Sequence, residues 1–185
     1  MNNLTKIHIA SKRKKLQTLE REFPGCQIID VTSKAEMPWV KFSPFYPHGD
    51  IPIPFSTRTA ASVEGIWQGL KVFKTTDVDM KCFSITTMKG IKRTVRRFGK
   101  VLGHRRGVDG ELLPYIEARK EIYLPAYNWV LENKLQRELI QLTEIANKQG
   151  LVLLDYETNT DINNPSKPLS HASLIRQYLE CNICS

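Results

Sequence analysis

The chain has 185 residues, of which 41% are hydrophobic and 25% are charged, a composition typical of a soluble globular protein that can bury a core. Its net charge is +8, and no apolar run approaches the roughly 20 residues that span a membrane. The N-terminus has no hydrophobic segment with a cleavage site. Of four cysteines, only Cys181 and Cys184 form a CxxC pair, too few for a zinc site. The sequence therefore predicts a cytoplasmic protein without a metal, a cofactor or a membrane partner.

The first 35 residues predict a βαβ-like extension. Two short apolar stretches, 6–10 and 27–31, favour strands, and the basic segment 11–23 between them favours a helix with Leu16 and Leu19 facing inward. Pro24-Gly25 ends that helix. Five of the ten prolines then fall between residues 38 and 54, which excludes an α-helix there and indicates an ordered loop rich in aromatic side chains.

A helix over residues 62–73 follows, and it carries polar side chains in a row. Glu64, Gln68 and Lys71 are spaced i, i+4 and i+7, so they fall within about 60° of one another on a helix. The apolar arc beside them consists of Val63, Ile66, Trp67 and Leu70. A carboxylate, an amide and an amine in one row suggest a site, although an ordinary amphipathic helix with a solvated face gives the same spacing.

Positive charge is concentrated in the next segment. Residues 89–106 contain no acid, and their basic side chains are Lys89, Lys92, Arg93, Arg96, Arg97, Lys100, Arg105 and Arg106. The pattern predicts a helix over 86–99 whose apolar stripe (Met88, Ile91, Val95, Phe98) packs inward while the basic residues face outward. Such a segment is typical of phosphate or nucleic-acid binding, although a charged face can also serve only for solubility.

The remaining segments complete a mixed α/β pattern. Helical periodicity runs over 112–148 with Pro125 kinking or dividing it, and Gly150 precedes a buried strand at 151–154. Polar residues follow that strand, and a last helix covers 170–179. We expect an α/β fold, largely helical around a small sheet, in one domain made of the extension 1–35, a core over 40–160 and a C-terminal loop and helix over 161–185.

Residues 42–73 resemble the NADAR family, named for its link to NAD and ADP-ribose metabolism. The resemblance covers residues 40–160 and is firmest over 42–73, where its matching positions are Phe42, Ser43, Phe45, Tyr46, Pro47, Val63, Glu64, Trp67, Gln68 and Lys71. Further similar stretches are 88–107, Arg119, 131–134 and 151–155. Two departures stand out. Gly65 replaces a histidine that usually follows the helix glutamate, and the usual D-x-x-W-G-x-G ending is missing.

The resemblance implies an N-glycosidase acting at a ribose C1′. The function we expect is ADP-ribosyl glycohydrolysis: cleavage of ADP-ribose from a base, guanine in DNA, which would reverse a DNA ADP-ribosylating toxin in a toxin–antitoxin or phage-defence setting. The alternatives are an N-glycosidase for riboflavin-pathway or related ribosyl-phosphate intermediates, and a non-catalytic ADP-ribose binder. A third is a basic nucleic-acid-binding module in which the helix row is structural.

The chemistry assigns roles to these residues. Glu64 would stabilise the oxocarbenium-like centre at C1′, and Lys71 would form a transient adduct, act as an acid, or only pair with Glu64. The expected substrate-binding residues are Phe42, Ser43, Phe45, Tyr46, Trp67, Gln68, Arg96, His104, Arg105, Asp155, Asn159 and His171. Of the basic side chains, Arg96, Arg97, His104 and Arg105 would hold the pyrophosphate. The expected nucleic-acid contacts are Lys89, Lys92, Arg93 and Arg97.

Overall fold

The computed structural model describes residues 7–183, which form two compact units that alternate along the chain. Of the described residues, unit 1 contains 7–43, 131–161 and 166–183, and unit 2 contains Pro44–Val130 and Ile162–Pro165. Each unit combines helices with at least one small sheet, so the expected mixed α/β class is confirmed. The grouping of all segments into one domain stays a prediction.

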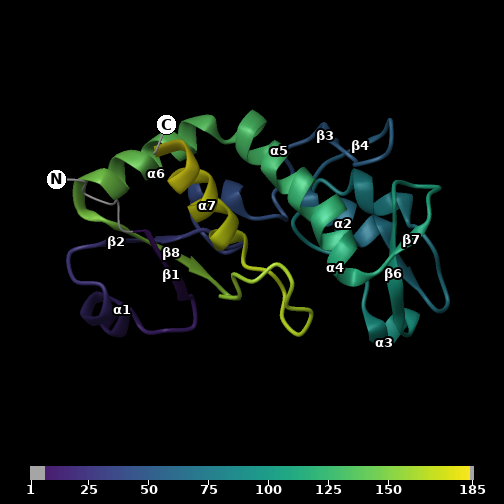
Figure 1. The fold of residues 1–185 in the computed structure, drawn as a ribbon, viewed down its shortest axis with the longest axis horizontal. Helices are drawn as coiled ribbons and strands as arrows, with labels where there is room; N and C mark the ends of the chain where they lie inside the picture. The colour runs from purple at the N-terminus through teal and green to yellow at the C-terminus, as the bar shows by residue number, and fades with distance from the viewer. Residues whose placement is uncertain (1–6, 184–185) are drawn as a thin grey trace. The chain divides into compact units, whose positions relative to one another are not determined.

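Unit 1 is built on a three-stranded parallel sheet in the order β1-β8-β2 (Figure 1). Its strands are β1 (Ile7–Ser11), β2 (Gln27–Asp30) and β8 (Leu151–Asp155). All five residues of β8 are buried, because the strand occupies the centre of the sheet; its first four residues are apolar and the fifth is Asp155. The strands expected at 27–31 and 151–154 are confirmed, as is the described part of 6–10; Lys6 lies outside the described residues.

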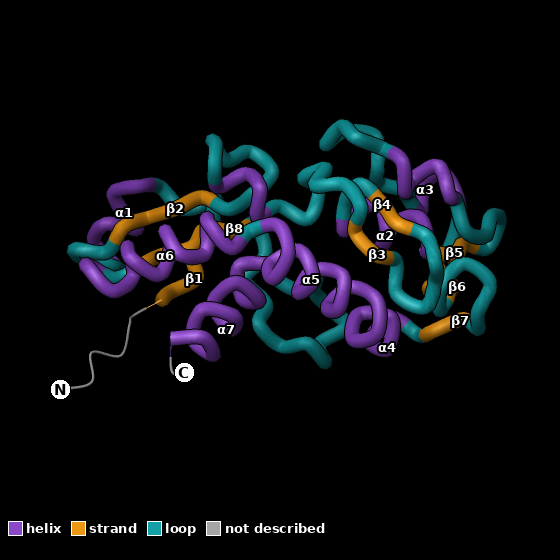
Figure 2. Tube along the Cα trace, turned by 90° about the horizontal axis from the view of Figure 1, so that it is seen from above, coloured by secondary structure: helices purple, strands orange, loops and turns teal. Residues whose placement is uncertain are grey.

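Three helices complete unit 1 around this sheet: α1 (Leu16–Glu22), α6 (Gln136–Gln149) and α7 (His171–Ile183). Helix α6 contacts β2 and β8, and α7 contacts β1 and β8 (Figure 2). The expected helix at 11–23 is shorter than predicted, and Leu16 is 60% exposed where an inward position was expected. The reason is that Lys12 donates its backbone N–H to Asp155 O (2.8 Å), which keeps the chain in a turn before the helix begins.

Unit 2 holds a hairpin, a three-stranded antiparallel sheet and short helices. The hairpin pairs β3 (Ile51–Pro52) with β4 (Thr59–Ala60), and the sheet has the order β5-β6-β7. Its strands are β5 (Lys71–Phe73), β6 (Val101–Arg105) and β7 (Leu112–Leu113). Helix α2 (Val63–Leu70) contacts β4, β6 and the 3-10 helix Met80–Ser84. No described residue of the proline-rich stretch 38–54 is α-helical, as expected; Trp39–Phe42 forms a 3-10 turn.

The prediction of a helix over 86–99 is wrong except at the end of that range. Only α3 (Val95–Phe98) is helical, and Val95 is 59% exposed. Gly90 adopts a positive φ of 75°, which interrupts a helix, and Arg93 turns inward to hydrogen-bond other segments. Ile91 alone of the expected apolar stripe is fully buried.

The long periodic stretch at 112–148 divides into several elements. After β7 it forms α4 (Tyr115–Ala118), a π-helical turn (Arg119–Tyr123), α5 (Leu124–Lys134) and α6. Pro125 has no N–H for an i−4 hydrogen bond, and the π-turn directly before it widens the helix there. The chain then breaks at Leu135, not at the proline. The C-terminal helix expected at 170–179 is confirmed by α7.

Candidate active site

Helix α2 places Glu64 in its first turn, inside unit 2. Ser62 caps the helix by accepting the backbone N–H of Gly65 (3.0 Å), and the backbone N–H of Glu64 bonds Pro44 O (2.8 Å). Only 8% of Glu64 is exposed. Burial raises the pKa of this carboxyl above its ordinary value, against the opposing effects of Gln68 and Lys71.

The side-chain amide of Gln68 hydrogen-bonds both other members of the row, Glu64 and Lys71. Its Oε1 accepts the backbone N–H of Arg93 (3.0 Å) and the Lys71 Nζ (3.2 Å), so the amide nitrogen is turned toward Glu64. That nitrogen donates to Glu64 Oε1 at 2.8 Å. The amide orientation is therefore fixed by a backbone donor, and Gln68 holds the carboxylate and the amine on either side of itself.

Lys71 lies beyond the end of the helix that was expected to carry it. Helix α2 ends at Leu70, and Lys71 is extended (ψ 128°) as the first residue of β5. Its Nζ still reaches Gln68, so the expected row survives although its last member stands on a strand. Burial, with the charges of Arg93 and Lys92, lowers the pKa of Lys71, while Glu64 opposes this. A lowered pKa favours the neutral amine that nucleophilic work requires.

Gly65, a departure from the resemblance, follows from the packing of α2. A Cβ at this position would lie 2.7 Å from the backbone oxygen of Cys82 in the 3-10 helix Met80–Ser84. Gly69 is equally constrained, because a Cβ there would lie 2.2 Å from the Phe83 ring. A histidine after Glu64 would thus force the 3-10 helix away. Because Gly65 and Gly69 have no side chains, the 3-10 helix Met80–Ser84 can pack closely against α2, which carries Glu64 and Gln68.

Trp67 and His104 form a stacked pair beside the row. Their ring centroids are 3.7 Å apart with an interplanar angle of 28°, and Tyr115 and Tyr123 meet the indole edge-on. His104 on β6 is the cross-strand partner of Lys71. Burial first, then the charges of Lys71 and Arg93, lower the pKa of His104 to about 3. A neutral imidazole has no charge with which to hold a pyrophosphate, so that expected role does not fit His104.

Arg93 is buried, which corrects its expected place on an outward nucleic-acid face. It is 7% exposed, and its guanidinium donates to the backbone oxygens of Gln68, Lys71 and Asp77 at 2.6–3.0 Å. These acceptors lie on α2, on β5 and in the turn after β5, so Arg93 ties three segments together. Sequence reasoning missed this role because its partners are 16 to 25 residues away along the chain.

The loop before α2 is split between the two units. Phe45 and Tyr46 in unit 2 are half-buried, and Lys92 Nζ lies 5.4 Å from the Phe45 ring centroid. The charge of Lys92 also acts on Glu64 and Lys71. These aromatics therefore remain candidates for stacking near the row. Phe42, by contrast, is fully buried in the core of unit 1, and Ser43 is also buried there; their expected substrate contacts stay predictions.

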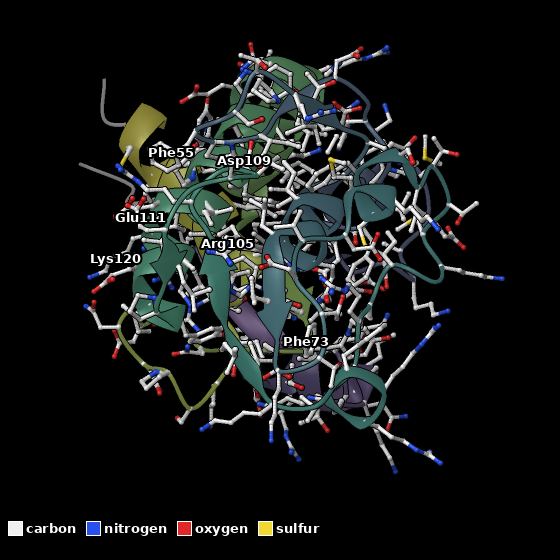
Figure 3. All side chains as sticks on the ribbon, turned by 90° about the vertical axis from the view of Figure 1, so that its right-hand side faces the viewer. Phe55, Phe73, Arg105, Asp109, Glu111 and Lys120 are labelled. Carbon is white, nitrogen blue, oxygen red and sulfur yellow. The ribbon has the colours of Figure 1, made fainter. Side chains whose placement is uncertain are left out.

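The other expected basic contacts differ in availability. Lys89, Lys92, Arg96 and Arg97 are exposed in unit 2. Arg105 pairs with Asp77 through Nε–Oδ1 (3.0 Å) and Nη2–Oδ2 (2.6 Å), which lowers the pKa of Asp77. Figure 3 shows Arg105 on β6 and Phe73 on the neighbouring strand β5. Successive strand residues point to opposite faces, so Arg105 lies on the face away from His104.

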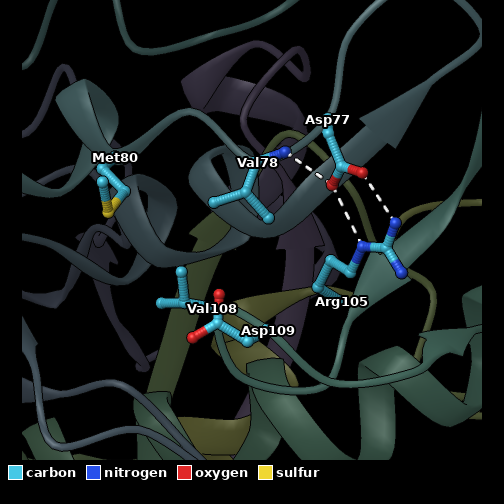
Figure 4. A pocket seen from close by; sticks show the side chains of 6 residues that line it. All are labelled: Asp77, Val78, Met80, Arg105, Val108 and Asp109. Carbon is cyan, nitrogen blue, oxygen red and sulfur yellow. Dashed lines mark hydrogen bonds and ion pairs between the residues drawn. The ribbon is translucent and has the colours of Figure 1, made fainter.

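A cavity of about 450 Å³ opens on this Arg105 side (Figure 4). Its lining residues are Asp77, Val78, Met80, Arg105, Val108 and Asp109. The Arg105 guanidinium is already engaged by Asp77, and none of the row Glu64–Gln68–Lys71 lines it. We therefore place the candidate site at the row and not at this cavity.

Asp155, Asn159 and His171 belong to unit 1, where they stabilise their own surroundings. Asp155 Oδ2 lies 3.0 Å from His171 Nδ1 and accepts from Ser170 Oγ (2.8 Å), while His171 Nε2 contacts Val31 O (2.8 Å). Burial opposes charge on both groups, but their attraction outweighs it, so the pKa of His171 is raised and that of Asp155 lowered. Asn159 bonds Asp161 O and Lys167 O of its own loop. Their expected substrate contacts stay untested.

Across residues 7–183 no group of three His, Cys, Asp or Glu side chains could hold a metal ion, and no helix is long and apolar enough to cross a membrane. Fold and site together define a mixed α/β protein in which a buried carboxylate, a buried amide and a half-buried amine form a row beside a stacked Trp–His pair.

Residues 11–175 match the model of a family described as "Family of unknown function (DUF6939)", so the chain belongs to this family. Neither the curated proteins nor the solved structures include a match.

Proposed function

We propose that this protein is an N-glycosidase that hydrolyses the bond between ADP-ribose and a base, guanine in DNA, with Glu64 and Lys71 at the reacting carbon. The resemblance of residues 42–73 to the NADAR family supplies the reaction class. The observation that carries the proposal is the row in which Gln68 bonds both Glu64 Oε1 (2.8 Å) and Lys71 Nζ (3.2 Å).

The row has the groups that this hydrolysis requires. The C1′–N bond breaks with its electron pair leaving on the base, so positive charge develops on the ribose and the base must gain a proton. Glu64, when ionised, would stabilise that charge and accept the proton of the attacking water; its raised pKa makes the carboxylate a stronger base for the second task. In one route Lys71 is protonated and gives its proton to the leaving base. In the other, the neutral amine bonds to C1′ as the base leaves with a proton from the Glu64 carboxyl, and water that gives its proton to Glu64 then displaces the amine.

The surroundings of the row favour a nucleotide attached to a polyanion. Phe45 and Tyr46 are half-buried aromatic side chains able to stack on a base. Lys89, Arg96 and Arg97 are exposed in a stretch that contains no acid. Counter-ion release from DNA phosphates would give this surface a salt-dependent affinity. A free riboflavin-pathway intermediate offers no reason for so extended a positive surface.

The test is release of ADP-ribose from an oligonucleotide that carries ADP-ribosylated guanine. Glu64→Gln preserves side-chain shape and an acceptor for Gln68 while removing the charge, and we expect it to lower kcat by about 10²–10⁴-fold. Lys71→Met should lose comparable activity. The matched control is Glu138→Gln, which removes another buried carboxylate, the ion-pair partner of Lys41 in unit 1. That variant should lose stability but keep kcat.

Three outcomes separate the alternatives. Tight ADP-ribose binding without release would make the protein a binder and refute the glycosidase proposal. Release from riboflavin-pathway ribosyl-phosphates but not from DNA would identify the small-molecule enzyme. Wild-type activity in both Glu64→Gln and Lys71→Met would show that the reaction occurs elsewhere.

A further inference from the structure

His104 is the least satisfied polar side chain near the row. It is 1% exposed, and within residues 7–183 neither ring nitrogen has a hydrogen-bond partner. Its position is nevertheless well defined, because Trp67 stacks on it from α2 and the β5–β6 ladder sets it opposite Lys71. The ring is thus held rigidly with both of its polar atoms unused.

An arrangement of this kind is unfavourable for the folded protein by itself. A buried donor or acceptor left unpaired costs about 1–3 kcal/mol, and a neutral imidazole has one of each. A phenylalanine would stack on Trp67 equally well without that cost. Two unpaired nitrogens in a ring held this rigidly point to a ligand contact.

We propose that His104 recognises the uncharged leaving base through one ring nitrogen, which makes a single hydrogen bond in the plane of the base, while the base lies next to Lys71 and Glu64. This inference rests on the proposed N-glycosidase function and specifies which part of the substrate meets β6. His104 is then a base-specificity residue, and the pyrophosphate is held elsewhere.

The charges around the ring select a neutral partner over a phosphate. An anion would be attracted by Lys71 and Arg93, but the ring itself stays uncharged because burial and those same cations oppose its protonation. A neutral imidazole has one N–H and one bare nitrogen that point away from each other, so either of them can make one hydrogen bond to a base edge. Trp67 and Lys71 are only half-buried, so a base in contact with them would border the ring.

The experiment pairs His104→Phe with the control His8→Phe, a half-buried histidine in unit 1 that packs against Phe23. We expect His104→Phe to unfold at the same temperature as wild type or higher, yet to bind guanosine about tenfold more weakly and to lose about 10–100-fold in kcat/KM on the ADP-ribosylated oligonucleotide. Affinity for pyrophosphate should not change. His8→Phe should leave all binding and rate constants unchanged.

A second measurement does not depend on the variant. In ¹⁵N spectra of histidine-labelled wild type at pH 6.0, the His104 ring should be neutral, and guanosine but not pyrophosphate should shift its nitrogen resonances. Wild-type guanosine affinity in His104→Phe, or a ring that responds only to pyrophosphate, would overturn the inference. If wild type binds guanosine through His104 but releases no ADP-ribose, the proposed reaction fails while the base contact stands.

Discussion

Replacing Gln68 with leucine tests whether one amide holds the candidate site together. Leucine has nearly the same size, so the change removes hydrogen bonds with little change in volume. The bonds lost are those to Glu64 (2.8 Å), from the Arg93 backbone N–H (3.0 Å) and from Lys71 (3.2 Å). Both Gln68 and Arg93 are buried, so water cannot replace these partners freely.

The size of the expected loss in stability follows from the hydrogen-bonding groups of Arg93 and Glu64 that the change leaves without a partner. The Arg93 N–H costs about 1–3 kcal/mol when buried without an acceptor, and the bond to the Glu64 carboxylate contributes about 1.5–3 kcal/mol. The apolar side chain of leucine offsets part of this, by about 1.5 kcal/mol. We therefore expect Gln68→Leu to lower the free energy of unfolding by about 2–4 kcal/mol. The control Gln149→Leu removes an exposed bond to Gln27 and should change it by less than about 0.5 kcal/mol.

Urea unfolding measures the loss in the free energy of unfolding, and amide hydrogen exchange shows which segment is destabilised. The Arg93 amide should be protected in wild type and should exchange much faster in Gln68→Leu, while amides of the parallel sheet in unit 1 keep their protection. A variant as stable as wild type, with the Arg93 amide still protected, would refute the view that Gln68 organises the row.

Two further predictions concern the ion pair of unit 1 and the basic surface of unit 2. His171 has its pKa raised above 6.5 and Asp155 lowered below 3.8 by folding, so the pair stabilises fully between these values. Its contribution declines as the pH rises through the folded pKa of His171 or falls through that of Asp155. Asp155→Asn should cost about 3–5 kcal/mol in urea unfolding at pH 5.5 and less at pH 8.5, and an equal cost at both would contradict this. Neutralising Lys89 and Arg97 together should reduce the slope of log K for DNA against log salt by about 2, whereas Lys148→Gln in unit 1 should leave the slope unchanged.

The sequence correctly predicted those elements whose conformation depends on residues that are close together in the chain. The apolar run of β8 and the helix start at Ser62 were found because a buried strand and an N-cap each have a short-range signature. The segment around Arg93 was misjudged for the same reason. Its spacing fits a helix with an outward arginine, but Gln68, Lys71 and Asp77 supply acceptors that draw the guanidinium inward.

The sequence alone predicted the mixed α/β class, the three strands of the parallel sheet in unit 1 and the row of Glu64, Gln68 and Lys71, because these depend on residues close together in the chain. Tertiary structure alone decided that Lys71 stands on β5, that Gln68 is oriented by a backbone N–H, and that His104 is stacked and neutral beside Trp67. Those facts depend on which distant segments exclude water from one another. Burial and pairing between segments, not periodicity, set the charge and direction of these side chains.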